Sequence, residues 1–214
     1  MLSTRTAIVF IALAASALSG CTTHVTPPQA VSDPVTVYIV DYGRHSSVLL
    51  PIDQPDTDPL GRTTLREYAY GDWVYYANTQ QSHWNGAKAL LWNTRGTLGR
   101  RDLSGLGPAS DEAPIEPAAR IERTLSVERV FPVVVEREAA TDLLALLDAR
   151  FETGGGDSSS LYNPDFDLDF VPDEASYSVL HQCNHEVRDW LVLMGVEASG
   201  APLVSEYKVN RRTP

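Results

Sequence analysis

An apolar run near the N-terminus places the strongest constraint on what this chain can fold into. Residues 7–18 form a twelve-residue apolar run, which follows the basic residue Arg5. A run of this length is too short to cross a bilayer as a helix of the mature protein, but it matches the hydrophobic region of an export signal. We therefore expect residues 1–20 to be a signal peptide and the folded part of the chain to begin after them.

A cysteine preceded by small residues follows the apolar run directly, as Leu18-Ser19-Gly20-Cys21. This segment resembles the lipobox of bacterial lipoproteins. The resemblance implies cleavage before Cys21 and acylation of that residue, and two or three acyl chains anchor a protein stably where one is marginal. Thr22 stands where some bacteria read an aspartate as a sorting signal, so the resemblance favours the outer membrane, facing the periplasm. The alternative is an ordinary secretory signal with a chance cysteine.

Charge and composition narrow the partners and the domain count. The net charge of −11 disfavours nucleic acids and anionic lipid head groups as partners. The chain is 43% hydrophobic, which is typical of a globular protein, and it is long enough for one domain with a full core. We expect residues 21–34, which are polar and contain prolines, to be a flexible lipid-anchored tether. Residues 35–214 are expected to form a single domain without a cofactor or a metal, and the oligomeric state stays open.

Periodicity and turn residues predict the main elements of that domain. We expect strands at 35–41, 45–50, 67–76 and 127–135, and helices at 79–93, 137–152 and 182–194. Pro132 predicts that the last of these strands lies at an edge.

Two further segments have less regular patterns. Residues 94–120 are rich in Gly, Pro and Ala, and predict a long loop. Residues 165–170 have the acidic spacing of a calcium loop, but Phe170 and Ser176 occupy the positions that need Gly and Glu. An extended, half-buried segment explains them better.

Cys183 is the residue with the clearest chemical potential. It lies in the first turn of the helix predicted at 182–194, on the apolar face formed by Val187, Trp190, Leu191 and Met194. A helix N-terminus lowers the pKa of a thiol, so we expect a value below the ~8.5 of free cysteine. Because Cys21 is consumed by acylation, Cys183 has no disulfide partner in an oxidising compartment. It is either an inert core residue or a nucleophile.

A cysteine nucleophile needs a base, and His45 is the best candidate. It begins a strand just after a turn, where it can face a helix packed on the sheet. His24 belongs to the expected tether, and His83 lies beside Trp84 in a weakly predicted helix. His185 lies two positions from Cys183 on the helix and points away from it.

Three stretches resemble a known family when they are taken together. They are Gly43–Pro51, Tyr70–Tyr76, and Gln182-Cys183-Asn184 leading a helix that ends at Gly195. The pattern is similar to domain-of-unknown-function family 2459, and more distantly to circularly permuted papain-like proteins of the NlpC peptidase and lecithin:retinol acyltransferase type. The resemblance implies an α+β, papain-like fold with an antiparallel sheet and packed helices.

The resemblance also implies roles for individual residues. Cys183 would be the nucleophile of a thiol hydrolase or acyltransferase acting on amide or ester bonds, and His45 its general base. The resemblance does not fix the third polar group, for which Asp72, within a matching motif, is the first choice and Glu67, on the same expected strand, is the alternative. An oxyanion donor would come from Tyr70 or from the Cys183 backbone N–H. In the envelope, peptidoglycan stem peptides are the expected substrate.

Two other classes of function compete with the enzyme. The first is a non-catalytic envelope module on the same fold, which binds a peptide or glycan in an aromatic groove. The aromatic side chains available for such a groove are Tyr70, Trp73, Tyr75, Tyr76, Trp84 and Trp92. The second is a metal site of His181, Cys183 and His185, which the helical periodicity disfavours because these residues face one way only on an extended strand.

Overall fold

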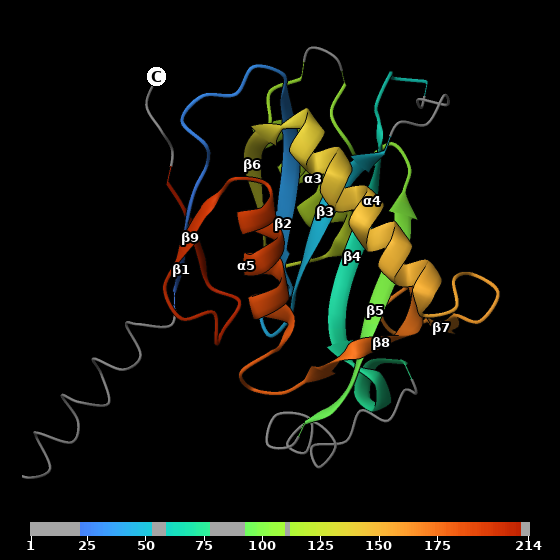
Figure 1. Ribbon diagram of the computed structural model, residues 1–214. Coiled ribbons are helices and arrows are strands. Elements are labelled where there is room, and N and C mark those ends of the chain that lie inside the picture. Colours follow the sequence, from blue (N-terminus) through green and yellow to red (C-terminus); the bar gives the residue numbers. More distant parts are fainter. Residues whose placement is uncertain (1–21, 53–58, 78–92, 110–111, 211–214) are drawn as a thin grey trace, which may run out of the picture.

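The computed structural model describes residues 22–52, 59–77, 93–109 and 112–210, and these residues form an α+β fold (Figure 1). A seven-stranded antiparallel sheet has the strand order β6-β2-β3-β4-β5-β8-β7. Its strands are β2 (Pro34–Asp41), β3 (Ser46–Ile52), β4 (Thr64–Asp72), β5 (Thr94–Leu103), β6 (Arg129–Glu136), β7 (Leu161–Asn163) and β8 (Leu168–Tyr177). The second sheet has three strands in the order β10-β1-β9, which are β1 (Thr23–Thr26), β9 (Glu197–Ser199) and β10 (Tyr207–Val209).

Helices cover both faces of the large sheet. The helical elements are the π-helical turn η1 (Trp73–Ala77), α3 (Ile115–Leu125), α4 (Arg137–Thr153) and α5 (Cys183–Leu193). In Figure 1, α4 and α5 lie in front of the sheet and α3 lies behind it. The larger core forms where Leu147 of α4 and Val187 of α5 pack against the same sheet face as Leu50. Behind the sheet, Ile121 of α3 packs against Leu49.

The β2–β3 hairpin forms as its sequence predicts. Apolar side chains line both strands, and Gly43 adopts a φ of +86° in the connecting turn, a conformation that favours glycine. The Tyr42 N–H donates to the His45 carbonyl at 2.9 Å and closes the turn. Strand β6 lies at the edge of the sheet, as Pro132 indicates. This turn fixes the position of His45, which directly precedes β3.

The expectation of a long loop over residues 94–120 is wrong. Residues 94–103 form β5 near the middle of the sheet, and α3 occupies the second half of the segment. The glycines of β5 serve the packing of neighbours, because a Cβ at Gly96 would overlap Tyr70 and a Cβ at Gly99 would overlap Phe170. Pro117 lies in the first turn of α3, where its missing N–H breaks no helical hydrogen bond.

The expectation of a flexible tether is also wrong for residues 23–26. They form β1, which pairs parallel with β10 and antiparallel with β9. Thr23 and Val25 are fully buried, and Val25 belongs to the larger core. After β1, Ser32 and Asp33 bond the carboxylate of Glu136. The chain is therefore held to the body of the protein from Thr23 onwards.

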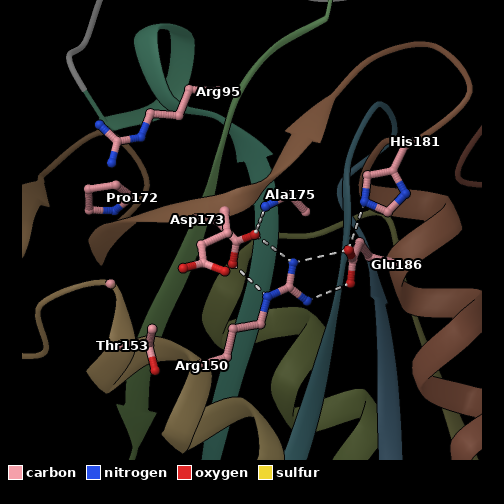
Figure 2. Close-up of a pocket in the computed structure, with 10 residues that line it drawn as sticks. Arg95, Arg150, Thr153, Pro172, Asp173, Ala175, His181 and Glu186 are labelled. Atoms are coloured by element: carbon pink, nitrogen blue, oxygen red, sulfur yellow. Dashed lines mark hydrogen bonds and ion pairs between the residues drawn. The ribbon is translucent and has the colours of Figure 1, made fainter.

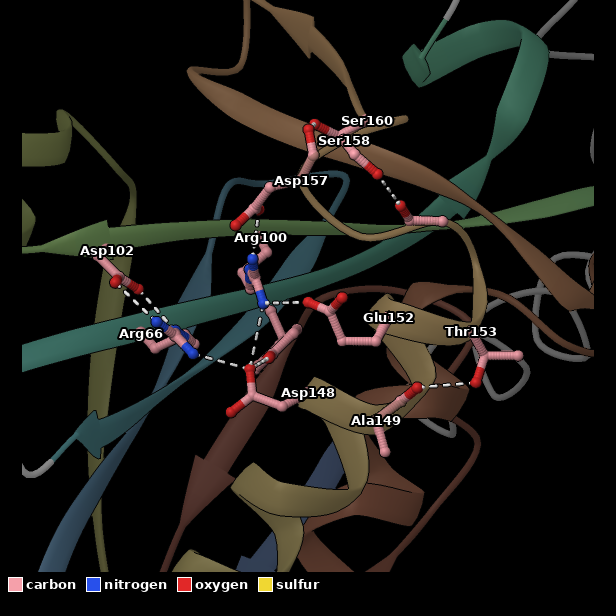
Figure 3. A network of polar contacts seen from close by, with 12 residues as sticks. Arg66, Arg100, Asp102, Asp148, Ala149, Glu152, Thr153, Asp157, Ser158 and Ser160 are labelled. Atoms are coloured by element: carbon pink, nitrogen blue, oxygen red, sulfur yellow. Dashed lines mark hydrogen bonds and ion pairs between the residues drawn. The ribbon is translucent and has the colours of Figure 1, made fainter.

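A polar network fixes α4 to the large sheet (Figure 3). Arg66 forms a two-pronged ion pair with Asp102 at 2.7 and 2.8 Å, and it reaches Asp148 of α4 at 2.7 Å. The hydroxyl of Tyr68 also donates to Asp148, and Arg100 lies 3.3 Å from the same carboxylate. Three strand residues thus converge on one helix residue, which sets the position of α4.

Of the other elements expected from the sequence, some are confirmed and some differ. Helices α4 and α5 begin and end close to the expected residues, and Gly195 adopts a φ of +76° after α5. Strand β4 ends at Asp72, and η1 follows where the strand was expected to continue. Residues 165–167 form a turn before β8 instead of an extended segment. The helix expected at 79–93 lies almost wholly outside the described residues.

Candidate functional site

Cys183 occupies the first turn of α5, as its sequence predicts. The preceding residue Gln182 has extended backbone angles, and the helix begins directly after it. The Cys183 side chain is only 1% exposed. Its thiol lies 3.4 Å from Gln182 Oε1 and 3.7 Å from Asn184 Oδ1. The helix start therefore places a covered thiol between two side-chain amides.

Backbone N–H groups surround the sulfur, but burial dominates its ionisation. Burial raises the pKa of the Cys183 thiol to about 11, although the N–H groups of Ser46, Asn184 and Cys183 act in the opposite direction. The helix N-terminus supplies two of these N–H groups, which have no carbonyl partner within the helix. The expected low thiol pKa is therefore wrong for this geometry. The thiol is neutral at physiological pH.

His45 lies at the mouth of a cavity of about 600 Å³. Its ring packs 5.2 Å from the ring of Tyr76 and 6.0 Å from that of Tyr42, measured between centroids. Its Nδ1 atom is buried and has no hydrogen-bond partner among the residues that the structure describes. Burial lowers the pKa of His45 to about 4, although the negative charge of Glu67 acts to raise it. The imidazole is therefore neutral and has a free nitrogen.

The structure brings Cys183 and His45 to the same corner of the sheet without a direct hydrogen bond. The sulfur lies against the backbone N–H of Ser46, which is the next residue after His45. Tyr76 interacts with both groups. Its ring contacts that of His45. Burial raises the pKa of Tyr76, and the negative charge that Cys183 carries when ionised acts in the same direction. A neutral thiol and a neutral imidazole thus flank one tyrosine.

Of the two carboxylates expected as a third group, Glu67 is the one that acts on His45. Glu67 is fully buried and accepts hydrogen bonds from Arg101 Nε at 2.6 Å, Tyr42 Oη at 2.6 Å and Ser47 Oγ at 2.5 Å. It lines the same cavity as His45. Asp72 was the first choice from the sequence. Its Oδ1 instead accepts a hydrogen bond from the Tyr75 N–H at 2.7 Å, at the start of η1.

Tyr70, expected as an oxyanion donor, is committed elsewhere. Its hydroxyl donates to the Ala175 carbonyl at 3.1 Å, and the guanidinium of Arg150 lies over its ring at 5.3 Å. Ala175 and Arg150 line a second pocket, of about 770 Å³, on the side of the sheet where α4 and α5 pack. Figure 2 shows Arg150 held between Asp173 and Glu186 in this pocket. The oxyanion donors left beside Cys183 are backbone N–H groups.

Sequence reasoning missed the side chains that support the thiol. Ser46 Oγ donates to Asn184 Oδ1 at 2.6 Å and lies 2.8 Å from Tyr207 Oη. These contacts join β3, α5 and β10 around Cys183. Ser46 follows the candidate base, and Asn184 follows the candidate nucleophile, so adjacency in the sequence was the available signal for both. Nothing in the sequence indicated Tyr207, which is distant along the chain.

The structure bears on the two alternative hypotheses, an aromatic groove and a metal site. Of the aromatic residues expected in a groove, Tyr76 lines the His45 cavity, whereas Trp73 is not among the residues that line it and its ring lies under the guanidinium of Arg95. Trp84 and Trp92 lie outside the described residues. Within the described ranges, no three His, Cys, Asp or Glu side chains are arranged to hold a metal ion. His181 lies 3.0 Å from Glu186, away from the thiol.

The neutral state of His45 predicts a loss of stability in acid. Its folded-state pKa lies below the unfolded value of about 6.5, so the unfolded chain takes up a proton first as the pH falls. Stability from this group is unchanged above about pH 6.5 and decreases by about 2–3 kcal/mol between pH 6.5 and 4. Urea unfolding of His45→Gln should show an acid loss smaller by that amount. Parallel stability curves for the two proteins would contradict the burial of a neutral imidazole.

No family model, curated protein or solved structure matches the chain. No helix among the described residues has the length and apolar character needed to span a bilayer.

Proposed function

We propose that the chain is an envelope lipoprotein that carries a thiol acyl-transfer site of papain-like type. Cys21, outside the described residues, carries the lipid, and the protein faces the periplasm at the outer membrane. Cys183 is the nucleophile and His45 its general base. The substrate has an amide or ester bond, and peptidoglycan stem peptides are the candidate in this compartment. The motif resemblance to family 2459 and to the permuted papain-like proteins supports this assignment.

The observation that carries the proposal is the position of the Cys183 sulfur. It lies at the start of α5, against the backbone N–H of the residue that follows His45, with N–H groups of Asn184 and Cys183 close by. Such N–H groups stabilise negative charge that develops on a sulfur or on an attacked carbonyl oxygen. A core cysteine in the middle of a helix would have none of them free.

The neutral resting state defines the chemistry. Since burial disfavours both the thiolate and the imidazolium, His45 takes the thiol proton during attack instead of holding a preformed ion pair. The sulfur forms a bond to the acyl carbon, and the proton passes from His45 to the departing amine or alcohol. Water, or an acceptor alcohol or amine, then attacks the thioester and releases Cys183. Glu67 contributes the negative charge that stabilises the transient imidazolium.

Acylation by an activated ester tests the proposal. Purified protein exposed to p-nitrophenyl acetate should gain one acetyl group on Cys183, detected by peptide mass spectrometry. Because His45 is neutral from about pH 5 upward, the acylation rate should be nearly constant between about pH 5 and 8 instead of following thiol ionisation. His45→Gln should slow acylation about 100-fold. His185→Gln, on the same helix as Cys183, is the matched control and should leave the rate unchanged.

Failure of this test would favour the second candidate, a non-catalytic binding module. The observation behind that candidate is the cavity beside His45, because Tyr42, Tyr76, Phe166 and Phe170 line it while the thiol stays covered. Aromatic walls with a few polar groups are typical of sites for small ligands. Unacetylated Cys183, or acetylation that does not depend on His45, together with retained binding of cell-wall fragments by Cys183→Ala, would establish the module in place of the enzyme.

A further inference from the structure

The folded body begins very close to Cys21, the residue proposed to carry the lipid. Thr23 is fully buried and its N–H donates to the Glu206 carbonyl at 2.8 Å. Only Thr22 separates this fixed residue from Cys21, and one extended residue spans about 3.5 Å. If Cys21 carries the acyl chains, as proposed above, the body cannot stand away from the bilayer on a long linker. Some part of the surface near Thr22 must contact the membrane interface.

Two loops near the start of β1 carry exposed aliphatic side chains. Four residues, Val179, Leu180, Leu203 and Val204, form what is called here the apolar patch, with exposed fractions of 43%, 77%, 43% and 42%. They come from two loops, at 178–181 before α5 and at 200–206 between β9 and β10. None of the four carries a charge, which suits contact with a lipid interface.

Hydrogen bonds hold the two loops together and beside the chain start. Gln182 Nε2 donates to the carbonyls of Leu203 at 2.9 Å and Pro202 at 3.3 Å, which joins the loops. Gly200 packs so closely against the Thr22 carbonyl that a Cβ there would overlap it. In Figure 1 the loop before α5, the loop after β9 and the start of β1 lie at the same lower side of the molecule. One of the two loops that carry the apolar patch therefore packs against Thr22, the residue next to Cys21.

We propose that the apolar patch docks on the zwitterionic phospholipid interface to which Cys21 is anchored. The occupant follows from the single residue between the acylated position and β1, and from the net charge of −11, which disfavours an anionic surface. Contact through four aliphatic side chains is weak for a free protein, but the anchor keeps the patch at a high effective concentration near the lipid. Docking holds the start of α5, which carries Cys183, close to the membrane.

Quenching of a fluorophore by nitroxide-labelled lipid tests the docking. The acylated full chain is purified from membranes as Leu180→Cys in a Cys183→Ala background and labelled with an environment-sensitive dye. It is then reconstituted into phosphatidylethanolamine–phosphatidylcholine vesicles. Nitroxide lipids labelled near the head group should reduce its emission at least about twofold. The same dye at Leu146→Cys, an exposed residue of α4, is the matched control and should be unaffected.

A second pair of variants separates the apolar patch from mere proximity. Leu203→Ser with Val204→Ser should abolish most of the quenching at position 180, whereas Val192→Ser with Leu193→Ser, exposed residues of α5, should leave it unchanged. Circular dichroism verifies that each variant is folded. Equal quenching at positions 180 and 146 in acylated protein would overturn the docking and leave the anchor intact. A mass spectrum without acyl chains on Cys21 would overturn the anchor and the docking together.

Discussion

Replacing Arg150 with methionine should destabilise the protein by about 3–5 kcal/mol at neutral pH, because it removes the guanidinium that two buried carboxylates share. Arg150 Nε and Nη2 bind Asp173 at 2.5 and 2.9 Å, and Nη1 and Nη2 bind Glu186 at 2.9 and 3.1 Å. The side chains of Asp173 and Glu186 are only 4% and 8% exposed. Methionine fills a similar volume, so the effect measures charge more than packing.

The pH dependence distinguishes this mechanism from a packing defect. Acid reduces the negative charge of carboxylates, so it also reduces the cost of leaving the buried pair without Arg150. The difference between variant and parent in urea unfolding should therefore shrink at pH 4. Arg137→Met, which removes an exposed ion pair with Asp33, is the matched control and should cost less than about 1 kcal/mol. A deficit for Arg150→Met that is the same at pH 4 and pH 7 would contradict the charge argument.

Replacing Glu67 with alanine should also cost about 3–5 kcal/mol, because the nearly buried Arg101 then keeps one carboxylate partner among the described residues, the exposed Asp167. Tyr42 and Ser47 also lose their acceptor. Glu67→Gln keeps an acceptor of the same shape and should cost less than Glu67→Ala. Chemical unfolding of the two variants measures the difference.

A double-mutant cycle tests whether the loss comes from the stranded cation. Glu67→Met combined with Arg101→Met removes both charges and should be more stable than Glu67→Met alone. The Glu67 variants should also lower the pKa of His45 further, since its nearest negative charge is gone. If the double variant is as unstable as the sum of the two single variants, the pair contributes by packing and hydrogen bonding alone.

The sequence predicted the elements whose patterns are local. The apolar runs of β2 and β3 and the helical spacing around Val187 each follow from neighbours a few positions apart, and the structure confirms these elements. The same periodicity placed Cys183 in the first buried turn of α5. The α+β class followed from these elements, whereas the papain-like assignment remains a proposal.

The elements that could not be predicted depend on distant partners. Strand β5 contains Gly96 and Gly99, which indicate a loop until the rings of Tyr70 and Phe170 that fill their space are known. Strand β1 has four residues and no hydrophobic alternation strong enough to predict a strand without its partners. Local sequence carries no information about either contact.

The sequence indicated which residues form the candidate site, but it did not indicate the ionisation state of Cys183. Position at a helix start indicated an activated Cys183, but the degree of burial, which decides the pKa, comes from side chains such as Tyr76 and Tyr207 that pack around it. The preference for Asp72 over Glu67 failed for a similar reason. Each carboxylate lies on β4, and only the three-dimensional structure reveals which one faces the cavity of His45.

The pairing of β1 determines when folding can be completed. Its neighbours in the small sheet are the last two strands among the described residues, and Asn210 bonds Thr26 across 184 residues of sequence. A chain that crosses a membrane with its N-terminus first exposes β1 long before β9 and β10 arrive. The core around Val25 therefore stays open until nearly the whole polypeptide has emerged. In the exported lipoprotein proposed above, export therefore precedes the final closure of the fold, and β1, the first strand to emerge, is among the last to pair.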